Sequence, residues 1–295
     1  MNKVIVITGP TAVGKTKLSI EIAKRYNGEI INADAVQIYK YLNIGSAKVK
    51  EEEKDDIPHH LFDIKELDEE YTVYHYQQDC RRVIEDIQRR GKTPILVGGT
   101  GLYIRAALYD YYFTNEEQHD DYDSFATNKL YEELLKIDPH ITIDPNNRRR
   151  LIRALRYYRE NNSSINTNKT DKLLYDTIFI GLTTDRQILY ERINKRVDQM
   201  LADGLLEEVK KFHSNNIRTK PLLNAIGYKE LYQYLDGNWT FEEAIDKIKQ
   251  NSRHYAKRQY TFFRHQLPIV WFETDFLDFT NTIEDVNNYI FNSQY

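Results

Sequence analysis

Hydrophobic and polar positions alternate along the first hundred residues with two different periods. Short apolar runs of strand length, bounded by turn residues, occur at residues 4–8, 29–32 and 94–97. Between and after them, apolar side chains recur at helical spacing over residues 15–26, 71–90 and 102–108. Continuous apolar runs are typical of parallel strands that are buried on both faces. The alternation predicts an α/β fold in which helices cover a parallel sheet.

The pattern then changes, since residues 110–125 are acidic and aromatic, without clear period. Helices are predicted around residues 130–137 and, with Asp144 as cap and Pro145 at the first helical position, up to about residue 159. Residues 161–172 are polar and are predicted to be mobile. The resulting division has an α/β core of residues 1–112 and 176–295 and a helical insertion of residues 113–175.

The last part of the chain is mostly helical. A strand is predicted at residues 176–182, followed by a capping box over residues 184–187. Helices are then predicted over residues 185–212, 222–235 and 241–263, and a final strand at residues 269–272. Gly204 is expected to break the first of these helices.

The first apolar run leads into a glycine-rich loop with the spacing of a phosphate-binding motif. Its members are Gly9, Pro10, Thr11, Ala12, Val13, Gly14, Lys15 and Thr16. Glycines let backbone N–H groups turn inward around a phosphate, and the N-terminus of the following helix adds a partial positive charge. Lys15 supplies a full charge, and Thr16 supplies a hydroxyl suited to Mg²⁺. The loop predicts a bound polyphosphate or diphosphate, without specifying ATP.

Polar residues also follow the other two predicted strands of the first hundred residues. Because ligands bind at the carboxyl ends of parallel strands, these residues should converge with the phosphate-binding loop. Asp34 is the best candidate for a general base, although a carboxylate here can also cap a helix. Thr100, between two glycines, can stabilise charge near the diphosphate or cap the next helix. Both alternatives remain open at this point.

The strand at residues 94–97 ends in Gly98 and Gly99, without an acidic residue. A nucleotide hydrolase usually carries an aspartate on such a strand to hold Mg²⁺ beside the phosphate. Its absence disfavours ATPase and kinase activity and favours diphosphate as a leaving group.

The charge of the chain is nearly balanced, with 41 Lys and Arg against 45 Asp and Glu, so binding to nucleic acid would need a local basic patch. Two predicted helices carry one. The first has Arg149, Arg153 and Arg156 on one face, with Arg148 and Arg150 beside them; the second has Arg253, Lys257 and Arg264, interleaved with His254, Arg258, Tyr255, Tyr260, Phe262 and Phe263. Basic residues with aromatic neighbours suit an RNA backbone and an unstacked base, although a charged helix face is often only solvated.

Other features exclude classes of protein. The single cysteine, Cys80, excludes an intrachain disulfide, fits a reducing cytoplasm and is predicted to be a small buried packing residue. No apolar run approaches the roughly 18 residues that span a bilayer, and the N-terminus does not look like a signal peptide. His59 and His60 lack a third metal ligand at suitable spacing, so a structural or hydrogen-bonding role is predicted for them.

An ordered set of motifs resembles the tRNA dimethylallyltransferase family of the bacterial type. Besides the loop at residues 9–16, the motifs are NADAVQIY at 32–39, NIGSAK at 43–48, PHHL at 58–61, VGGTGLY at 97–103, RRLIRAL at 149–155, AIGYKE at 225–230 and AKRQYTFFR at 256–264. The resemblance covers residues 3 to about 272 and implies a P-loop NTPase-like core. The sequence lacks the zinc-finger extension of the eukaryotic members, so a bacterial-type enzyme is expected.

The resemblance implies transfer of a dimethylallyl group from dimethylallyl diphosphate to N6 of the adenosine beside the tRNA anticodon. The phosphate-binding loop and Mg²⁺, with Thr16 as ligand, would hold the diphosphate, and Asp34 would accept the N6 proton. Thr100 would face the diphosphate and the tRNA. The expected tRNA contacts are Asp34, Ala35, Val36, Gln37, Thr100, Arg149, Arg150, Arg153, Lys257, Arg258 and Arg264. The expected partners are the anticodon arm and the donor, without a membrane, and we expect a monomer.

Three positions depart from the family pattern: Asn32 and Ala35 stand where serine is usual, and Asn224 replaces a longer polar or basic residue. These departures bear on tRNA contacts rather than on the reaction. Prenyl transfer to a free adenine nucleotide is the nearest alternative, and it would not need two basic helices. A small-molecule kinase would need an acidic Mg²⁺ ligand, and a non-catalytic RNA-binding module would not need the phosphate-binding loop.

Overall fold

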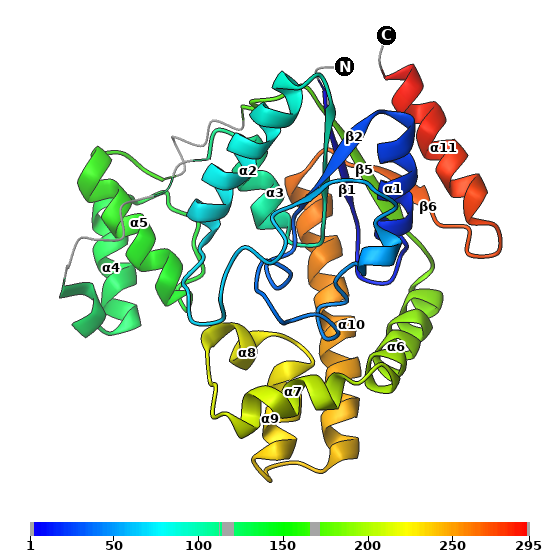
Figure 1. Ribbon diagram of the computed structural model, residues 1–295. Coiled ribbons are helices and arrows are strands. Elements are labelled where there is room, and N and C mark those ends of the chain that lie inside the picture. Colours follow the sequence, from blue (N-terminus) through cyan, green and yellow to red (C-terminus); the bar gives the residue numbers. More distant parts are fainter. Residues whose placement is uncertain (1–2, 112, 114–120, 166–171, 294–295) are drawn as a thin grey trace. The chain divides into compact units, whose positions relative to one another are not determined.

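A six-stranded sheet, in which every strand is parallel to its neighbours, forms the centre of the computed structural model (Figure 1). The strands follow the order β3-β2-β4-β1-β5-β6. Their bounds are β1 (Val4–Thr8), β2 (Gly28–Asn32), β3 (His59–His60), β4 (Thr93–Val97), β5 (Thr177–Thr183) and β6 (Val270–Glu273). The predicted α/β fold with a P-loop NTPase-like parallel core is therefore confirmed. The prediction missed β3, because two residues are too few to form a pattern.

The structure describes residues 3–111, 113, 121–165 and 172–293. The chain forms two compact units, one made of Met1–Leu108 and Tyr175–Tyr295 and the other of Tyr109–Leu174. The second unit occupies the region interpreted from the sequence as an insertion of residues 113–175. Residues 166–171 of the segment predicted to be mobile lie outside the described residues.

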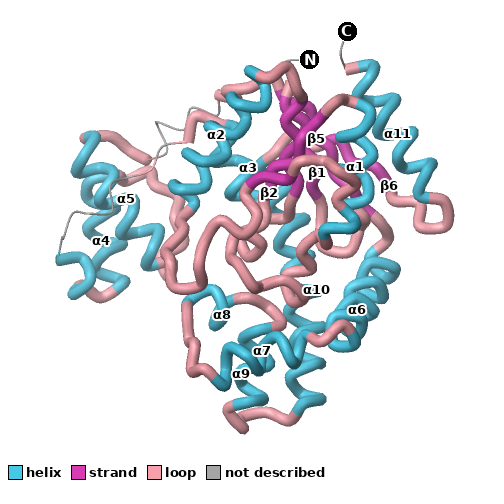
Figure 2. Tube along the Cα trace, in the orientation of Figure 1, coloured by secondary structure: helices cyan, strands magenta, loops and turns pink. Residues whose placement is uncertain are grey.

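Helices cover both faces of the sheet in the first unit. On one side α1 (Lys15–Arg25) packs with α11 (Phe279–Asn292), and on the other α2 (Val73–Arg89) packs with α3 (Gly101–Leu108) (Figures 1 and 2). Apolar residues of α1, α11 and the strands form one buried cluster, which includes Leu18, Ile5 and Val286. Cys80 of α2 is fully buried, as predicted.

The remaining helices of this unit build a second apolar cluster. They are α6 (Arg186–Ala202), α7 (Leu205–Ser214), α8 (Lys220–Asn224), α9 (Tyr228–Leu235) and α10 (Phe241–Gln266). Ala244 and Ile248, in the first half of α10, belong to this cluster, whereas Ala256 belongs to the cluster beside the sheet. The long helix α10 therefore connects the two clusters.

Several predicted helix boundaries were wrong. The segment 222–235 is two helices, since Gly227 adopts a left-handed φ of 96° between them. The predicted capping box at 184–187 is a simple cap, in which the Asp185 side chain accepts hydrogen bonds from the backbone N–H groups of Gln187 and Ile188. The break predicted at Gly204 is confirmed, with a φ of 101°. Helix α11 was not predicted.

The second unit contains two helices, α4 (Thr127–Ile137) and α5 (Arg148–Asn161), which pack around Leu130, Leu134 and Leu151. Helix α5 begins later than predicted, because Asn147 is its cap and the Asp144 side chain closes a local turn by accepting from the N–H of Asn146. Short 3₁₀ turns lie at Asp121–Ser124 here and at Glu51–Glu53 in the first unit.

Among the described residues, no helix combines the length and the apolar character needed to cross a bilayer. The described part of the chain also holds no group of three or more His, Cys, Asp or Glu side chains placed to bind a metal ion. His60 instead bonds Glu29 through Nε2 at 2.7 Å, and His59 Nδ1 bonds the carbonyl of Ile57. The predicted hydrogen-bonding role of the two histidines is confirmed.

Candidate active site

The phosphate-binding loop connects β1 to α1, as its sequence predicts. Gly9 has a φ of 134°, and a Cβ added there would lie 2.5 Å from the carbonyl oxygen of Leu182 in β5. Gly14, at the start of α1, has a φ of 97°. L-amino acids with side chains rarely adopt such angles, so both positions require glycine for the loop to turn tightly.

Lys15 is held across this loop. Its Nζ donates hydrogen bonds to the carbonyl oxygens of Gly9, at 3.0 Å, and Pro10, at 2.7 Å. Burial lowers the pKa of Lys15 to about 7; the charge of Arg196 acts in the same direction, and the carboxylate of Asp34 acts against it. The Lys15 ammonium therefore shares its surroundings with a second cation and with the predicted base.

The second cation, Arg196, was missed by the sequence analysis. It lies on α6, where burial lowers the pKa of its guanidinium and the Asp34 carboxylate raises it. Within the described chain it makes no hydrogen bond or ion pair. One turn earlier, Arg192 donates from Nε to the carbonyl of Ala12 at 3.0 Å. The spacing of two arginines four residues apart was the available signal, but nothing in the sequence connected α6 to the loop.

Asp34 follows β2 in a tight turn that a buried amide holds in place. The side chain of Asn32, 0% exposed, accepts from the N–H of Asp34 at 2.9 Å and donates to the Asp34 carbonyl at 3.1 Å. Asp34 Oδ1 accepts from the N–H of Val36 at 2.9 Å. No helix follows, so the alternative of a helix cap is wrong. Asn32, one of the departures from the family pattern, is thus a buried residue that holds this turn.

Thr100 binds this turn rather than capping its own helix. Its Oγ1 accepts from the N–H of Ala35 at 3.1 Å, and its N–H donates to the carbonyl of Ala33 at 3.0 Å. Thr8, at the end of β1, donates to the carbonyl of Gly98 at 2.9 Å. Three adjacent strands, β2, β4 and β1, thus bring their following loops together, as the predicted convergence requires.

Gln37 is tied to a loop that carries another of the quoted motifs. Its Nε2 donates to the carbonyl oxygens of Ser46, at 2.9 Å, and Ala47, at 3.3 Å. The carboxylate of Glu208, from α7, accepts from the N–H of Ile44 at 3.0 Å and bonds the hydroxyl of Tyr228. The motifs at residues 43–48 and 225–230 therefore support the segment that follows Asp34.

Comparison with known proteins places these features in a family. The family model described as IPP transferase matches residues 37–266. The chain belongs to the IPP transferase family. A curated relative from Anoxybacillus flavithermus, named tRNA dimethylallyltransferase, is 50% identical over 98% of this chain and 96% of its own length. A relative of the same name from Macrococcus caseolyticus is 47% identical over 97% of this chain and 96% of its own length.

Solved structures of IPP transferases agree in fold. The tRNA delta(2)-isopentenylpyrophosphate transferase of Staphylococcus epidermidis matches with a TM-score of 0.76 and 40% identity, over 98% of this chain and 99% of that one. A eukaryotic dimethylallyltransferase described as acting on tRNA matches with a TM-score of 0.87 and 32% identity, over 99% of this chain and 80% of that one. The similarity to these proteins covers both described units of this IPP transferase.

The basic residues predicted to bind tRNA lie in both units of this IPP transferase. On α10, Lys257, Arg258 and Arg264 are exposed, and the Arg264 guanidinium lies 5.1 Å from the centre of the Tyr260 ring. On α5, Arg149 and Arg150 are exposed, whereas Arg153 donates to the hydroxyl of Tyr111 at 3.1 Å. Asn224 is exposed at the end of α8, and its side chain bonds the carbonyl of Lys220.

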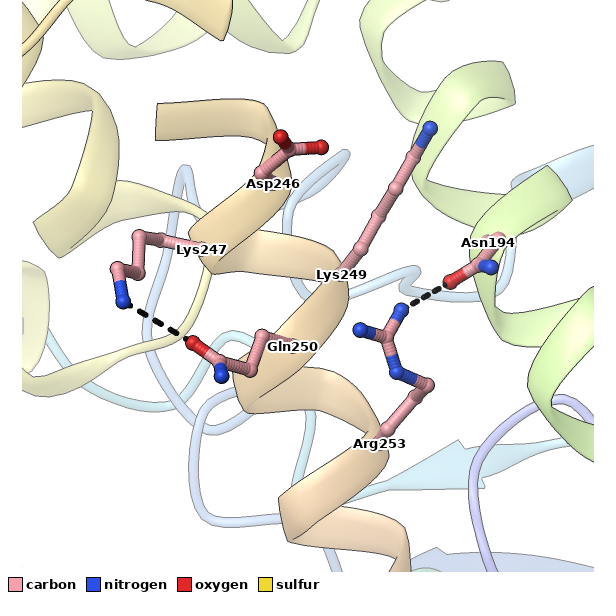
Figure 3. A pocket seen from close by; sticks show the side chains of 6 residues that line it. All are labelled: Asn194, Asp246, Lys247, Lys249, Gln250 and Arg253. Carbon is pink, nitrogen blue, oxygen red and sulfur yellow. Dashed lines mark hydrogen bonds between the residues drawn. The ribbon is translucent and has the colours of Figure 1, made fainter. Parts of the chain in front are cut away.

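A separate polar pocket of about 510 Å³ lies between α6 and α10 (Figure 3). It is lined by Asn194, Asp246, Lys247, Lys249, Gln250 and Arg253, none of which was predicted to act in catalysis. Arg253 donates to Asn194 Oδ1 at 2.6 Å, and Lys249 pairs with Asp198. The Arg253 guanidinium is thus bonded within the protein, unlike the exposed Lys257, which was predicted on the same basic helix. The chemistry is therefore better assigned to the loops than to this pocket.

Proposed function

We propose that this IPP transferase moves a dimethylallyl group from dimethylallyl diphosphate to N6 of the adenosine next to the tRNA anticodon. The observation that carries the proposal is the combination of charges at the loops. Asp34, the proposed base, is close enough to Lys15 and Arg196 to shift the pKa of each. A base beside two cations suits a reaction in which an amine attacks and diphosphate leaves.

The roles follow from the bonds that change. The N6 nitrogen of adenosine attacks C1 of the dimethylallyl group, and the bond from C1 to the diphosphate oxygen breaks, with its electron pair leaving on the diphosphate. Asp34 accepts the proton that the nitrogen loses. Lys15 and backbone N–H groups at the N-terminus of α1 stabilise the charge on the departing diphosphate, and Arg196 adds a second cation. Thr100, bonded to the turn that holds Asp34, keeps the base facing this cradle.

The residues at the loop fit Mg²⁺ as cofactor. Thr16 is exposed at the start of α1, where its hydroxyl can reach an ion bound to the diphosphate. Mg²⁺ usually keeps several waters and takes few protein ligands besides substrate phosphates, which agrees with the lack of an acidic cluster among the described residues. When bound, the ion neutralises part of the charge on the leaving diphosphate.

The proposed acceptor is the anticodon arm of tRNA. The exposed cations of α10 and α5 offer contacts to RNA phosphates, and residues Asp34 to Gln37, with Thr100, would contact the target region. The target base must leave its stack to reach a site enclosed by three loops. We further propose a cytoplasmic monomer, which agrees with the single, buried Cys80.

The test is incubation of the protein and Mg²⁺ with donor labelled in its dimethylallyl group and with either bulk tRNA or AMP. We expect label in tRNA, and digestion of that tRNA should yield N6-dimethylallyladenosine. Label in AMP alone would support the alternative, transfer to a free nucleotide. Label in neither would contradict prenyl transfer.

A further inference from the structure

One buried amide joins two of the loops that form the proposed site. Gln259, on α10, is 4% exposed. Its Oε1 accepts a hydrogen bond from the N–H of Thr11 in the phosphate-binding loop at 3.2 Å, and its Nε2 donates to the carbonyl oxygen of Gly99 at 3.0 Å. An amide presents a donor and an acceptor at a fixed spacing, so this one side chain ties both loops to the same helix.

The connection continues through Thr100, which follows Gly99 in the chain. The Thr100 hydroxyl binds the turn that carries Asp34. Hydrogen bonds of the Gln259 amide and of the Gly99–Thr100 loop thus lead from Thr11 to the N–H of Ala35, beside the proposed base. Tyr255, one turn before Gln259 on α10, lies close to the same loops: burial, and after it the nearby Asp34 carboxylate, raise its pKa to about 12.

Close packing leaves this amide little freedom. A Cβ added at Gly99 would lie 2.0 Å from Gln259 Nε2, so the amide rests directly against the glycine backbone. Gly99 has no special backbone angle that would demand glycine, and the contact with Gln259 is what a larger residue would disturb.

We propose that Gln259 is a positioning residue for prenyl transfer. It holds the phosphate-binding loop and the Thr100 loop at the separation at which the donor carbon meets the acceptor nitrogen, and it touches neither substrate. The inference rests on the proposed function. Near-attack geometry is sensitive, since a displacement of about 1 Å can cost ~10²-fold in rate. Because Lys257 and Arg258 are exposed on the same helix, the proposal separates a residue that sets geometry from neighbours proposed to bind RNA.

The first test replaces Gln259 with methionine, which has a similar length but neither a donor nor a strong acceptor. We expect the single-turnover transfer rate, at saturating donor and tRNA, to fall roughly 10- to 100-fold, while the Kd for tRNA stays unchanged. Gln250→Met is the matched control, because Gln250 lies on the same helix and its side chain bonds, among the described residues, only the exposed Lys247. Its rate should equal that of the wild type.

The second test separates positioning from a loss of folding. In Gln259→Glu, an ionised carboxylate can still accept from Thr11 but repels the Gly99 carbonyl, whereas a protonated carboxyl restores both bonds. The rate relative to wild type should therefore recover as the pH falls from about 8 to about 5.5. Asp34, Lys15, Tyr255 and Arg258 surround this position in both proteins, so their own titrations largely cancel in the ratio. The ratio for Gln259→Met should stay flat.

A double-mutant cycle gives a third measurement. Gly99→Ala should displace the amide and slow transfer, and combining it with Gln259→Met should cost less than the two single effects together. Wild-type transfer rates in Gln259→Met, a flat ratio for Gln259→Glu, or a loss confined to tRNA affinity would each overturn the positioning role. A wild-type protein that labels no tRNA would instead overturn the proposed function, so the two failures are distinguishable.

Discussion

Strand β2 has an acidic residue near each end, and the fold treats the two differently. Glu29, in the second position of the strand, is 2% exposed. Its carboxylate receives two hydrogen bonds from Arg90, at 2.5 and 2.7 Å, and lies 2.8 Å from Lys92 Nζ and 2.7 Å from His60 Nε2. These contacts, those to Arg90 first, hold the pKa of Glu29 well below its usual range. Every charge at this end has a partner inside the protein.

The carboxylate of Asp34, just past the other end, is bonded only to the backbone N–H of Val36 among the described residues. The nearby cations are also left without carboxylates: Lys15 binds two carbonyl oxygens, and Arg196 makes no hydrogen bond or ion pair in the described chain. An acid that is fully paired stabilises a fold, whereas an acid and two cations left unpaired together mark a place that is organised for a charged ligand. The two ends thus differ in whether the carboxylate has a charged partner bonded to it.

The largest effect on transfer should come from removing Lys15, the main cation beside Asp34. We expect Lys15→Ala to abolish detectable transfer, because the leaving diphosphate loses the charge that stabilises it. The assay is labelled donor with bulk tRNA and Mg²⁺. Lys17→Ala is the control, because Lys17 points over the Phe279 ring at 5.0 Å instead of toward the loop. Retained transfer in Lys15→Ala would show that the cradle does not hold the leaving group.

The acid of the same end should matter nearly as much. Asp34→Asn keeps an oxygen that can accept from Val36, so the turn should survive while the base is lost. We expect single-turnover rates to fall by ~10²-fold or more, the usual range for a general base. The Kd for tRNA, measured by filter binding, should not change. A normal rate would remove Asp34 from the proposed mechanism.

Replacing Glu29, the paired acid, should instead change stability and leave transfer unaffected. Glu29→Gln should lower the free energy of unfolding by about 3 kcal/mol, the low end of the range for breaking a buried pair, because the cations are partly exposed. The transfer rate per folded molecule should stay the same. Urea unfolding measures the free energy of unfolding, with Glu21→Gln, at a half-exposed position of α1, as a control near wild type.

The same residue gives a pH dependence with a defined sign. Because its folded pKa is lowered, the contribution of Glu29 is complete above its usual pKa of 4.5 and is lost as the pH falls further. The stability gap between wild type and Glu29→Gln should therefore shrink in acid. A stability difference that grows in acid would show that the ionised form of Glu29 does not stabilise the fold.

The lowered pKa of Lys15 predicts a pH dependence of donor binding. Above about pH 7 the free enzyme should lose the Lys15 charge, so the KM for the donor should rise, by up to about tenfold per pH unit. Lys15→Arg keeps its charge at every such pH, and its KM should be flatter, whatever its absolute value. An equal rise in both proteins would place the titration elsewhere.

The smallest effect is expected at an exposed cation of α10. Lys257 has no hydrogen-bond or ion-pair partner for its ammonium among the described residues, whereas Lys24 of α1 pairs with Glu21 and Asp55. Lys257→Ala should weaken tRNA binding a few-fold and reduce the slope of log K against log salt by about 1. Lys24→Ala should leave the slope unchanged. If both variants behave alike, pairing does not identify the RNA-binding cations.

The sequence by itself determined the features that depend on neighbouring residues. The glycine spacing at residues 9–16 predicts the phosphate-binding loop, and apolar runs of four or five residues predict most of the strands. Asp34 and Thr100 could be chosen because each follows such a run, and parallel strands present their carboxyl ends at one edge. The register agrees, since Val97 of β4 lies opposite both Ile7 of β1 and Asn32 of β2.

The tertiary structure alone decided which distant residues complete the site. Gln259 bonds Thr11 across 248 positions of sequence, and Arg196 reaches the same loop from α6. Periodicity reports only which face of a helix is buried, and an arginine or glutamine on a partly buried face carries no sign of the loop it will meet. Such contacts follow from the order of strands and the packing of α6 and α10, so they exist only once the whole chain has folded.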